Sequence, residues 1–146
     1  MPIPATNELK RVLRSEGFSI YRSGEDRVVL AERVRENLIM DAGVVALLER
    51  PARVQLTTRA QSSVFPGDSS EQLASRARSL GEPALSAGYT EAGSAVVQVA
   101  DPGDPGRTLD TVSEVVYVKT VSTLAELLDE LRFAVGLEKI ATPRRG

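Results

Sequence analysis

The chain has 146 residues, of which 42% are hydrophobic and 26% are charged, and its formal net charge is −2 at pH 7. These values match an average globular domain, and they exclude a disordered or fibrous chain and a net positive field that would attract nucleic acid or anionic lipid. The aromatic content of 4%, with no tryptophan, leaves few side chains on which single-stranded bases could stack. We therefore expect one domain over residues 1–140 that binds neither nucleic acid nor membrane.

Cysteine and histidine are both absent from the sequence. The chain therefore has no disulfide framework, no thiolate, no imidazole ligand for zinc and no side chain that normally titrates near neutral pH. Residues 1–8 lack the basic start and apolar core of a signal peptide, and no stretch approaches 18 apolar residues. We expect a cytoplasmic protein without cofactor or metal.

A short helix and a strand are predicted at the start of the chain. Thr6 can cap a helix that ends at Gly17. The apolar face of this helix consists of Leu9, Val12 and Leu13. Residues 18–21 then favour a strand, and residues 23–26 favour a turn into the next strand.

Residues 27–61 hold the densest run of β-branched and aliphatic side chains, which predicts the centre of a sheet. Residues 53–61 alternate with period two, so that one face of this strand is polar. The buried parity is predicted to be Val54, Leu56, Thr58 and Ala60. A turn around Pro51 predicts a hairpin before this strand. Residues 30–38 fit either a strand or a helical stripe, and we favour a strand because charged residues interrupt the stripe.

The middle of the chain predicts a helix after a Pro-Gly break, in which Phe65 is expected to contact the core. Asp68 and Glu71 have the spacing of a capping box, and Gly81 is the expected stop. The apolar face of this helix consists of Leu73, Ala74, Ala77 and Leu80. Residues 83–87 can add another helical turn.

Two strand signals follow, separated by glycine and proline. Residues 89–91 and 95–99 favour strands on either side of a turn at residues 92–94. The two Asp-Pro-Gly triplets within residues 101–110 predict a surface loop. Residues 112–121 are the second strong strand signal, with apolar side chains on both parities.

The end of the chain predicts the longest helix, which begins with a Thr123–Glu126 capping box and ends at Gly136. Its apolar positions are Leu124, Leu127, Leu128, Leu131 and Val135. Residues 141–146 are expected to form a flexible basic tail.

The element order therefore predicts an α+β fold, α-β-β-β(β)-α-β-β-α, with a mainly antiparallel sheet. Two strands with apolar side chains on both parities need cover on both faces, and three amphipathic helices must supply it. Either the helices divide between the two faces, or part of one face meets another subunit. The commonest arrangement of the second kind is a two-fold dimer, and we predict a homodimer.

This order of elements, together with the size and the acidic pI, resembles the small α+β fold of type III secretion chaperones and the related YbjN-like proteins. The resemblance spans most of residues 9–135. It implies a bacterial protein, typically dimeric, that holds other polypeptides in extended form and has no catalytic activity. The hairpin around Pro51 and the Asp-Pro-Gly loop depart from the family's pattern.

A partner-binding site is predicted on the polar parity of the strand at residues 53–61. Its residues are Arg53, Gln55, Thr57 and Arg59. They can receive an acidic or extended peptide, because the arginine fork matches carboxylates in a bidentate manner. The alternative is an ordinary solvated strand face.

Other site chemistries have less support. Asp101, Asp104 and Asp110 lack the spacing of a calcium loop, and aspartate before proline and glycine is typical of turns. An enzyme would have to use residues such as Glu114 and Lys119, which lie on opposite parities and so point to opposite faces. We therefore predict no catalytic residue and a chaperone-like or adaptor protein. The alternatives are a regulatory or scaffold subunit of a larger bacterial machine, and a small hydrolase without histidine and cysteine.

Overall fold

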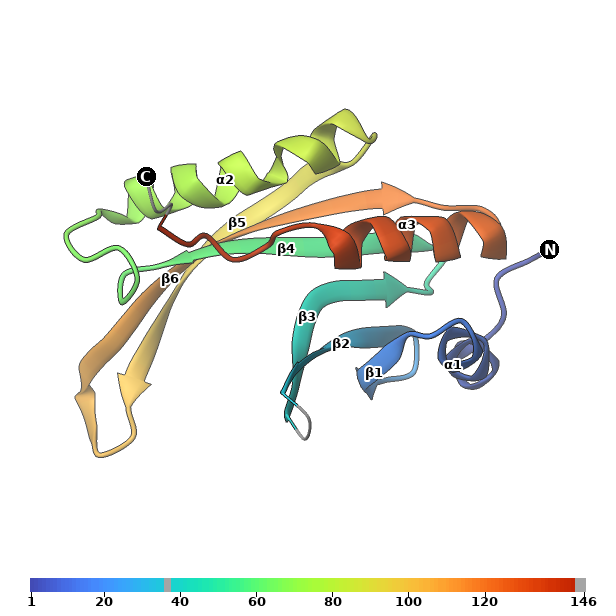
Figure 1. The fold of residues 1–146 in the computed structure, drawn as a ribbon, viewed down its shortest axis with the longest axis horizontal. Coiled ribbons are helices and arrows are strands. Elements are labelled where there is room, and N and C mark those ends of the chain that lie inside the picture. The colour runs from blue at the N-terminus through green and yellow to red at the C-terminus, as the bar shows by residue number, and fades with distance from the viewer. Residues whose placement is uncertain (36–37, 144–146) are drawn as a thin grey trace. The chain divides into compact units, whose positions relative to one another are not determined.

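The structure, a computed structural model, describes residues 1–35 and 38–143, with the side chains of residues 33–35 outside that description. Within these ranges the chain forms three helices and a six-stranded antiparallel sheet with strand order β1-β2-β3-β4-β6-β5 (Figure 1). The strands are β1 (Ser19–Ser23), β2 (Arg27–Arg35), β3 (Leu38–Leu47), β4 (Arg53–Gln61), β5 (Thr90–Asp101) and β6 (Asp104–Thr120). The helices are α1 (Thr6–Ser15), α2 (Ser70–Ser86) and α3 (Leu124–Gly136). The α+β class and the predicted order of elements are confirmed.

The chain packs as two compact units. The first contains Met1–Leu56 and Val118–Leu137, and so holds α1, α3 and β1 to β3. The second contains Thr57–Tyr117 and the C-terminal residues from Glu138, and so holds α2 and β5. Strands β4 and β6 contribute residues to both units. The single domain over residues 1–140 stays a prediction.

In the first unit, the strands that we placed at the centre of the sheet carry its core. Residues 42, 44 and 46 of β3 are buried, and α3 packs against this strand. Val54 and Leu56 of β4 pair with Ala46 and Val44, so they lie on the same buried face. The buried residues of the helices are Leu9 and Leu13 of α1 and Leu127, Leu131 and Ala134 of α3. The period-two alternation predicted for β4 is confirmed.

A bulge interrupts the pairing of β2 with β3. Val29 is opposite Val45 and Ala31 is opposite Asp41, so three residues of β3 face a single residue of β2. Gly43 lies in this bulge with φ +73°, a conformation that other residues adopt with strain, and its N–H donates to Asp41 Oδ1 at 2.7 Å. The described parts of residues 30–42 are strand, as we favoured, and residues 36 and 37 lie outside the described residues.

In the second unit, a small apolar core joins the end of β4, the following loop, α2 and the C-terminal segment. It consists of Ala60, Phe65, Leu73 and Ala141. The predicted contact of Phe65 with the core is therefore confirmed. Ala141, which we assigned to a flexible tail, is buried, and its N–H donates to the carbonyl of Arg59 at 2.9 Å. Residues 144–146 of that tail lie outside the described residues.

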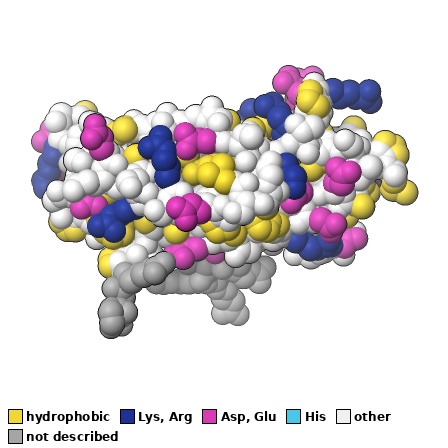
Figure 2. Space-filling model, turned by 90° about the horizontal axis from the view of Figure 1, so that it is seen from above, with side chains coloured by type: hydrophobic (Ala, Val, Ile, Leu, Met, Phe, Trp, Pro, Cys, Tyr) yellow, Lys and Arg dark blue, Asp and Glu magenta, His cyan; other side chains and the backbone are white. Residues whose placement is uncertain are grey.

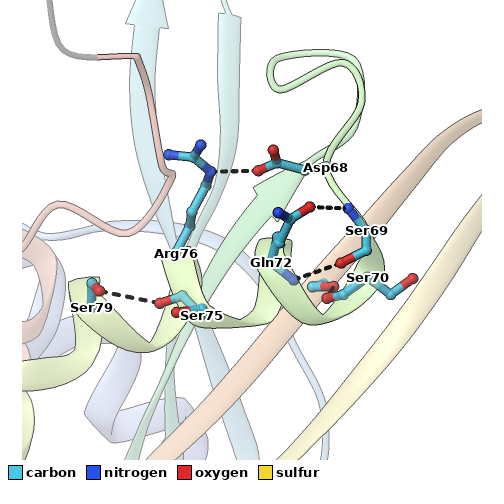
Figure 3. Close-up of polar contacts among 8 residues, drawn as sticks. Asp68, Ser69, Ser70, Gln72, Ser75, Arg76 and Ser79 are labelled. Carbon is cyan, nitrogen blue, oxygen red and sulfur yellow. Dashed lines mark hydrogen bonds and ion pairs between the residues drawn. The ribbon is translucent and has the colours of Figure 1, made fainter.

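The sequence predictions placed the N-caps of α1 and α2 one residue away from their positions in the structure. The cap of α2 is Ser69, which forms a reciprocal capping box with Gln72, rather than Asp68 with Glu71 (Figure 3). Asp68 instead accepts a hydrogen bond from Arg76, the seventh residue of the helix, at 2.6 Å. The cap of α1 is Ala5, which makes no side-chain cap bond, and the Thr6 hydroxyl donates to the carbonyl of Glu25 at 2.7 Å. The predicted cap of α3 at Thr123 is confirmed.

The prediction that α2 ends at Gly81 was wrong, because the helix continues to Ser86. Gly81 is buried within the helix against the ring of Tyr117, and a Cβ at this position would overlap that ring. This glycine serves close packing of helix on sheet rather than termination. With 17 residues, α2 is longer than α3 with 13, so the C-terminal helix is not the longest of the described helices.

The prediction of a surface loop at residues 101–110 was also wrong. β5 runs without a turn through residues 92–94 to Asp101, and β6 begins at Asp104. Only the first Asp-Pro-Gly triplet makes a turn, in which the N–H of Gly103 donates to Asp101 Oδ1 at 2.9 Å. The second triplet, which includes Pro105, lies within β6, where a missing N–H is tolerated at a free strand edge.

Candidate binding surfaces

The predicted strip on β4 is half-buried rather than fully exposed, and it divides between the two units. Arg53 and Gln55 belong to the first unit, where they line an open cavity of about 460 Å3. The other lining residues are Gly24, Glu25, Asp26, Arg27, Leu47 and Glu49. The cavity therefore presents both signs of charge, whereas an acidic peptide would require a surplus of positive charge.

The second pair of the strip, Thr57 and Arg59, lies in the second unit. The guanidinium of Arg59 is 3.7 Å from the Glu114 carboxylate, and about a third of its side chain is exposed. The N–H of Arg59 donates to the carbonyl of Lys139 at 2.8 Å, so the C-terminal segment already pairs with this part of β4. The buried alternation of β4 was predictable, but the role of the strip in binding stays a prediction.

A more exposed apolar surface lies on the hairpin of β5 and β6. We call residues 91–109 the β5–β6 ribbon. Every residue from 90 to 100 of β5 and from 104 to 109 of β6 is exposed, on both parities. The large apolar side chains of the ribbon are 53% exposed at Val96, 42% at Val97, 43% at Val99 and 51% at Leu109. Within its unit, the far end of the ribbon extends beyond α2 (Figure 1).

The free part of the ribbon begins where β4 ends. The N–H of Ser62 donates to the carbonyl of Thr111 at 2.9 Å, which places the end of β4 beside this residue of β6. Within the described residues, the part of β6 from Asp104 to Leu109 therefore has β5 as its only strand neighbour. A two-stranded ribbon with two wet faces is marginally stable by itself.

Asp110 fixes the base of the ribbon to the loop after β4. Its carboxylate accepts hydrogen bonds from Ser62 Oγ at 2.9 Å, from Ser63 N and Oγ at 3.0 and 2.8 Å, and from Gln61 Nε2 at 3.2 Å. Partial burial alone would raise the pKa of Asp110, but the bonds from Ser63 and Ser62 outweigh it and hold the pKa below the usual range of aspartate. This carboxylate is used as a structural acceptor rather than as the calcium ligand that we considered.

A second attachment joins the start of β5 and the middle of α2. Arg78 Nε donates to Glu91 Oε1 at 3.1 Å. Tyr117 is fully buried against Gly81, and burial together with the negative charge of Glu91 raises its pKa. The base of the ribbon is therefore packed and bonded within the second unit, whereas its far end is exposed.

A smaller apolar surface occurs in the first unit, at the start of β3. Leu38, Ile39 and Met40 are 47%, 44% and 50% exposed. They are consecutive, so they lie on both faces of the strand.

Sequence reasoning missed the ribbon because glycine at position 93 was taken as a turn. The available signal was charge: residues 92–100 contain no charged side chain, although 26% of the chain is charged. Both Val96 and Val97 are exposed, which departs from the alternation of a half-buried strand.

On the face in Figure 2, acidic and basic side chains are interspersed, with hydrophobic side chains between them. None of the helices in the described ranges has the length and hydrophobicity needed to cross a bilayer. The described residues also contain no cluster of three or more acidic side chains placed to hold a metal ion. Comparison of the chain with protein-family models, with curated proteins and with solved structures finds no match.

Proposed function

We propose that this protein is a non-catalytic protein-binding module that holds a segment of another polypeptide, as a chaperone or an adaptor does. The observation that carries the proposal is the β5–β6 ribbon, on which four large aliphatic side chains are exposed. Val97 and Val99 lie on one face of β5 and Val96 on the other. Exposed apolar surface of this kind is found at interaction sites, and its burial contributes roughly 25 cal/mol per Å2. The resemblance to secretion chaperones, which rests on element order, points in the same direction.

The charged residues considered for an enzyme have structural partners, which favours binding over catalysis. Glu114 lies 3.7 Å from Arg59 in the second unit. In the first unit, the ammonium group of Lys119 lies 2.7 Å from the Glu130 carboxylate. Both side chains are therefore already engaged in ion pairs.

We also propose that the protein acts in the bacterial cytoplasm as a two-fold homodimer. Val45 and Leu47 support a dimer, because these side chains are half-buried on the parity of β3 opposite its buried residues. Sedimentation equilibrium at micromolar protein is expected to give the dimer mass. A monomer mass that does not change with concentration would contradict the dimer.

The binding proposal is tested by affinity capture from the native host with a ribbon variant. Val96→Thr, Val97→Thr and Leu109→Thr together remove apolar area while placing a β-branched side chain at each position. We expect the triple variant to capture at least tenfold less of the main partner protein than the wild type does, with little change in Tm. The matched control is Leu85→Thr, which removes a 47% exposed leucine from α2. Equal capture by the triple variant and the wild type would contradict the proposal.

The strip on β4 is tested separately by the double charge reversal Arg53→Glu and Arg59→Glu. If the strip contacts the partner, capture weakens while thermal stability stays nearly unchanged, because a partly exposed ion pair with a separation of 3.7 Å contributes little. Unaltered capture of the partner would remove the strip from the binding site.

A further inference from the structure

We infer that the outer edge of β5 binds one extended segment of the partner by strand addition, and that this segment has an uncharged β-branched centre flanked by lysine or arginine. The inference rests on the proposed function and gives the chemistry of the segment that the protein holds.

The edge of β5 is available for pairing because β5 ends the strand order. In the described sheet, its only strand neighbour is β6. Alternate residues of an edge strand direct their N–H and C=O groups away from the sheet, and an extended peptide can pair with them. With 12 residues, β5 is long enough for a partner segment of about seven residues.

Sequence chemistry distinguishes the two edges of the ribbon. On the β6 side, Pro105 and Arg107 occupy the part of the strand beyond β4, and proline and charge are the features by which edges resist pairing. On the β5 side, residues 92–100 contain neither proline nor charge. Strand addition is therefore opposed on the β6 edge and unopposed on the β5 edge.

The charges around the open edge favour a partner with basic ends. Residues 90–110 carry four acidic residues and one arginine, and Arg78 of α2 pairs with Glu91, which leaves a net charge of −2 around the ribbon. Glu91 and Asp101 lie on either side of the uncharged stretch, so a bound segment meets an acid near each end. Because Glu91 also pairs with Arg78, the acid at this end is partly neutralised within the protein. A partner strand with basic residues at both ends satisfies this arrangement in either direction.

The same charges disfavour a second copy of this chain as the occupant. Antiparallel pairing of two β5 strands centred on Val96 would place Glu91 of each copy opposite Asp101 of the other. Like charges directly opposite each other destabilise a strand pair. The side chains between them, Val96, Val97 and Val99, instead suit β-branched residues on a strand of different sequence.

The inference is tested with three synthetic peptides and the full-length protein, using fluorescence anisotropy. The first peptide has seven alternating valine and threonine residues with two lysines at each end. The second has glutamates in place of the lysines, and the third has the lysines but N-methyl groups on alternate central amides. We expect the first peptide to bind at least tenfold more tightly than either of the others. Its affinity should fall with added salt.

Two further measurements locate the peptide. Hydrogen exchange should slow within residues 92–100 and stay unchanged within residues 104–109. In the double variant Glu91→Gln and Asp101→Asn, the preference for basic over acidic flanks should fall at least threefold. The Asp101→Asn substitution keeps the turn at the end of β5, because the amide oxygen of asparagine can still accept from the N–H of Gly103.

Three outcomes would overturn the inference. The basic and acidic peptides could bind equally tightly, or the peptide could slow hydrogen exchange on the β6 edge. Dimerisation without peptide could also slow hydrogen exchange within residues 92–100 relative to the monomer, which would make a second copy the occupant of the edge. If the peptides fail but the ribbon is still needed to capture the host protein, the proposed function stands and the edge assignment fails. If the ribbon variant captures normally, the proposed function itself fails.

Discussion

The two strands at the ends of the strand order differ in how far they are protected from pairing with another chain. β1 has five residues, includes Arg22, and has a register shift between Ile20 and Arg22. β5 has 12 residues, of which positions 92–100 are uncharged. Short length, charge and irregular register are the features by which strands avoid unwanted pairing. β1 has all three protective features, whereas β5 has none of them within residues 92–100. An unprotected edge is expected of a strand that binds a partner.

The inner neighbours of these strands differ as well. β2, beside β1, is buried at residues 28–31 on both parities. β6, beside β5, has buried residues only from Val112 onward, in its C-terminal half. The far half of β5 therefore has no packed support, and its strand structure depends on the residues that fix the base of the ribbon.

The largest expected effect follows from removing that support at Gly81. In Gly81→Val the new side chain would overlap the Tyr117 ring, so α2 must move away from β6. Overpacking a tight core site typically costs about 1–3 kcal/mol, and we expect a loss of about 3 kcal/mol in the free energy of unfolding, measured by urea denaturation. Backbone hydrogen exchange should become faster at the first residues of β5, because their pairing with β6 is weakened.

Gly93→Val is the matched control, because this glycine lies in β5 with no atom within 4 Å of a Cβ placed on it. Valine favours strands, so its stability should stay within about 0.5 kcal/mol of the wild type. Equal destabilisation by both substitutions would contradict the packing role of Gly81.

Asp110→Asn is expected to cause the second-largest loss of stability, because it weakens the attachment of the ribbon to the loop after β4. The carboxylate accepts from Ser62, Ser63 and Gln61, and an amide can replace only part of this pattern. We expect a loss of about 1–2 kcal/mol at pH 7. Urea denaturation of wild type and variant measures the difference, and a Ser75→Ala control on α2 should leave stability within about 0.5 kcal/mol.

The pH dependence of this difference follows from the lowered pKa of Asp110. Despite the opposing effect of burial, hydrogen bonds from Ser63 and Ser62 depress the folded-state pKa, so the carboxylate contributes its full stability above the unfolded pKa of about 3.9. That contribution is lost as pH falls below about 4 toward the folded-state pKa. The gap between wild type and Asp110→Asn should be constant from about pH 5 to 8 and should narrow below about pH 4. A gap that widens on acidification would contradict this assignment.

The elements that were predictable from sequence are those with strong periodicity. The alternation at residues 53–61 gave β4 with its buried parity, and the spacing of leucines after Thr123 gave α3. Both patterns report burial on one side of an element, which local sequence encodes directly. The fold class followed from their order.

The errors occurred where a local signal was overridden by packing. Gly81 has the appearance of a helix stop, but its missing Cβ makes room for a tyrosine 36 positions later in the chain. Pro105 has the appearance of a loop residue, but a strand with one free edge can hold it. Such long-range causes cannot be read from neighbouring residues. The exposure of β5 on both parities escaped prediction because Gly93 was taken as a turn, although the uncharged run at residues 92–100 was visible in the sequence. Of the two candidate binding surfaces, the strip was predicted as a polar parity and the ribbon was not.

The smallest effect on stability, and the most direct comparison of the two edges, comes from placing the same charge on each. Val97→Lys adds a charge to β5 and Tyr21→Lys adds one to β1, at side chains that are 42% and 44% exposed. Each should change the free energy of unfolding by no more than about 0.5 kcal/mol, as surface substitutions usually do. An unprotected edge favours association between chains, whereas an edge that already contains arginine gains little from a second charge. Light scattering at elevated temperature should therefore show slower aggregation for Val97→Lys and an unchanged rate for Tyr21→Lys. Equal slowing by both substitutions would mean that the two edges do not differ in exposure to pairing.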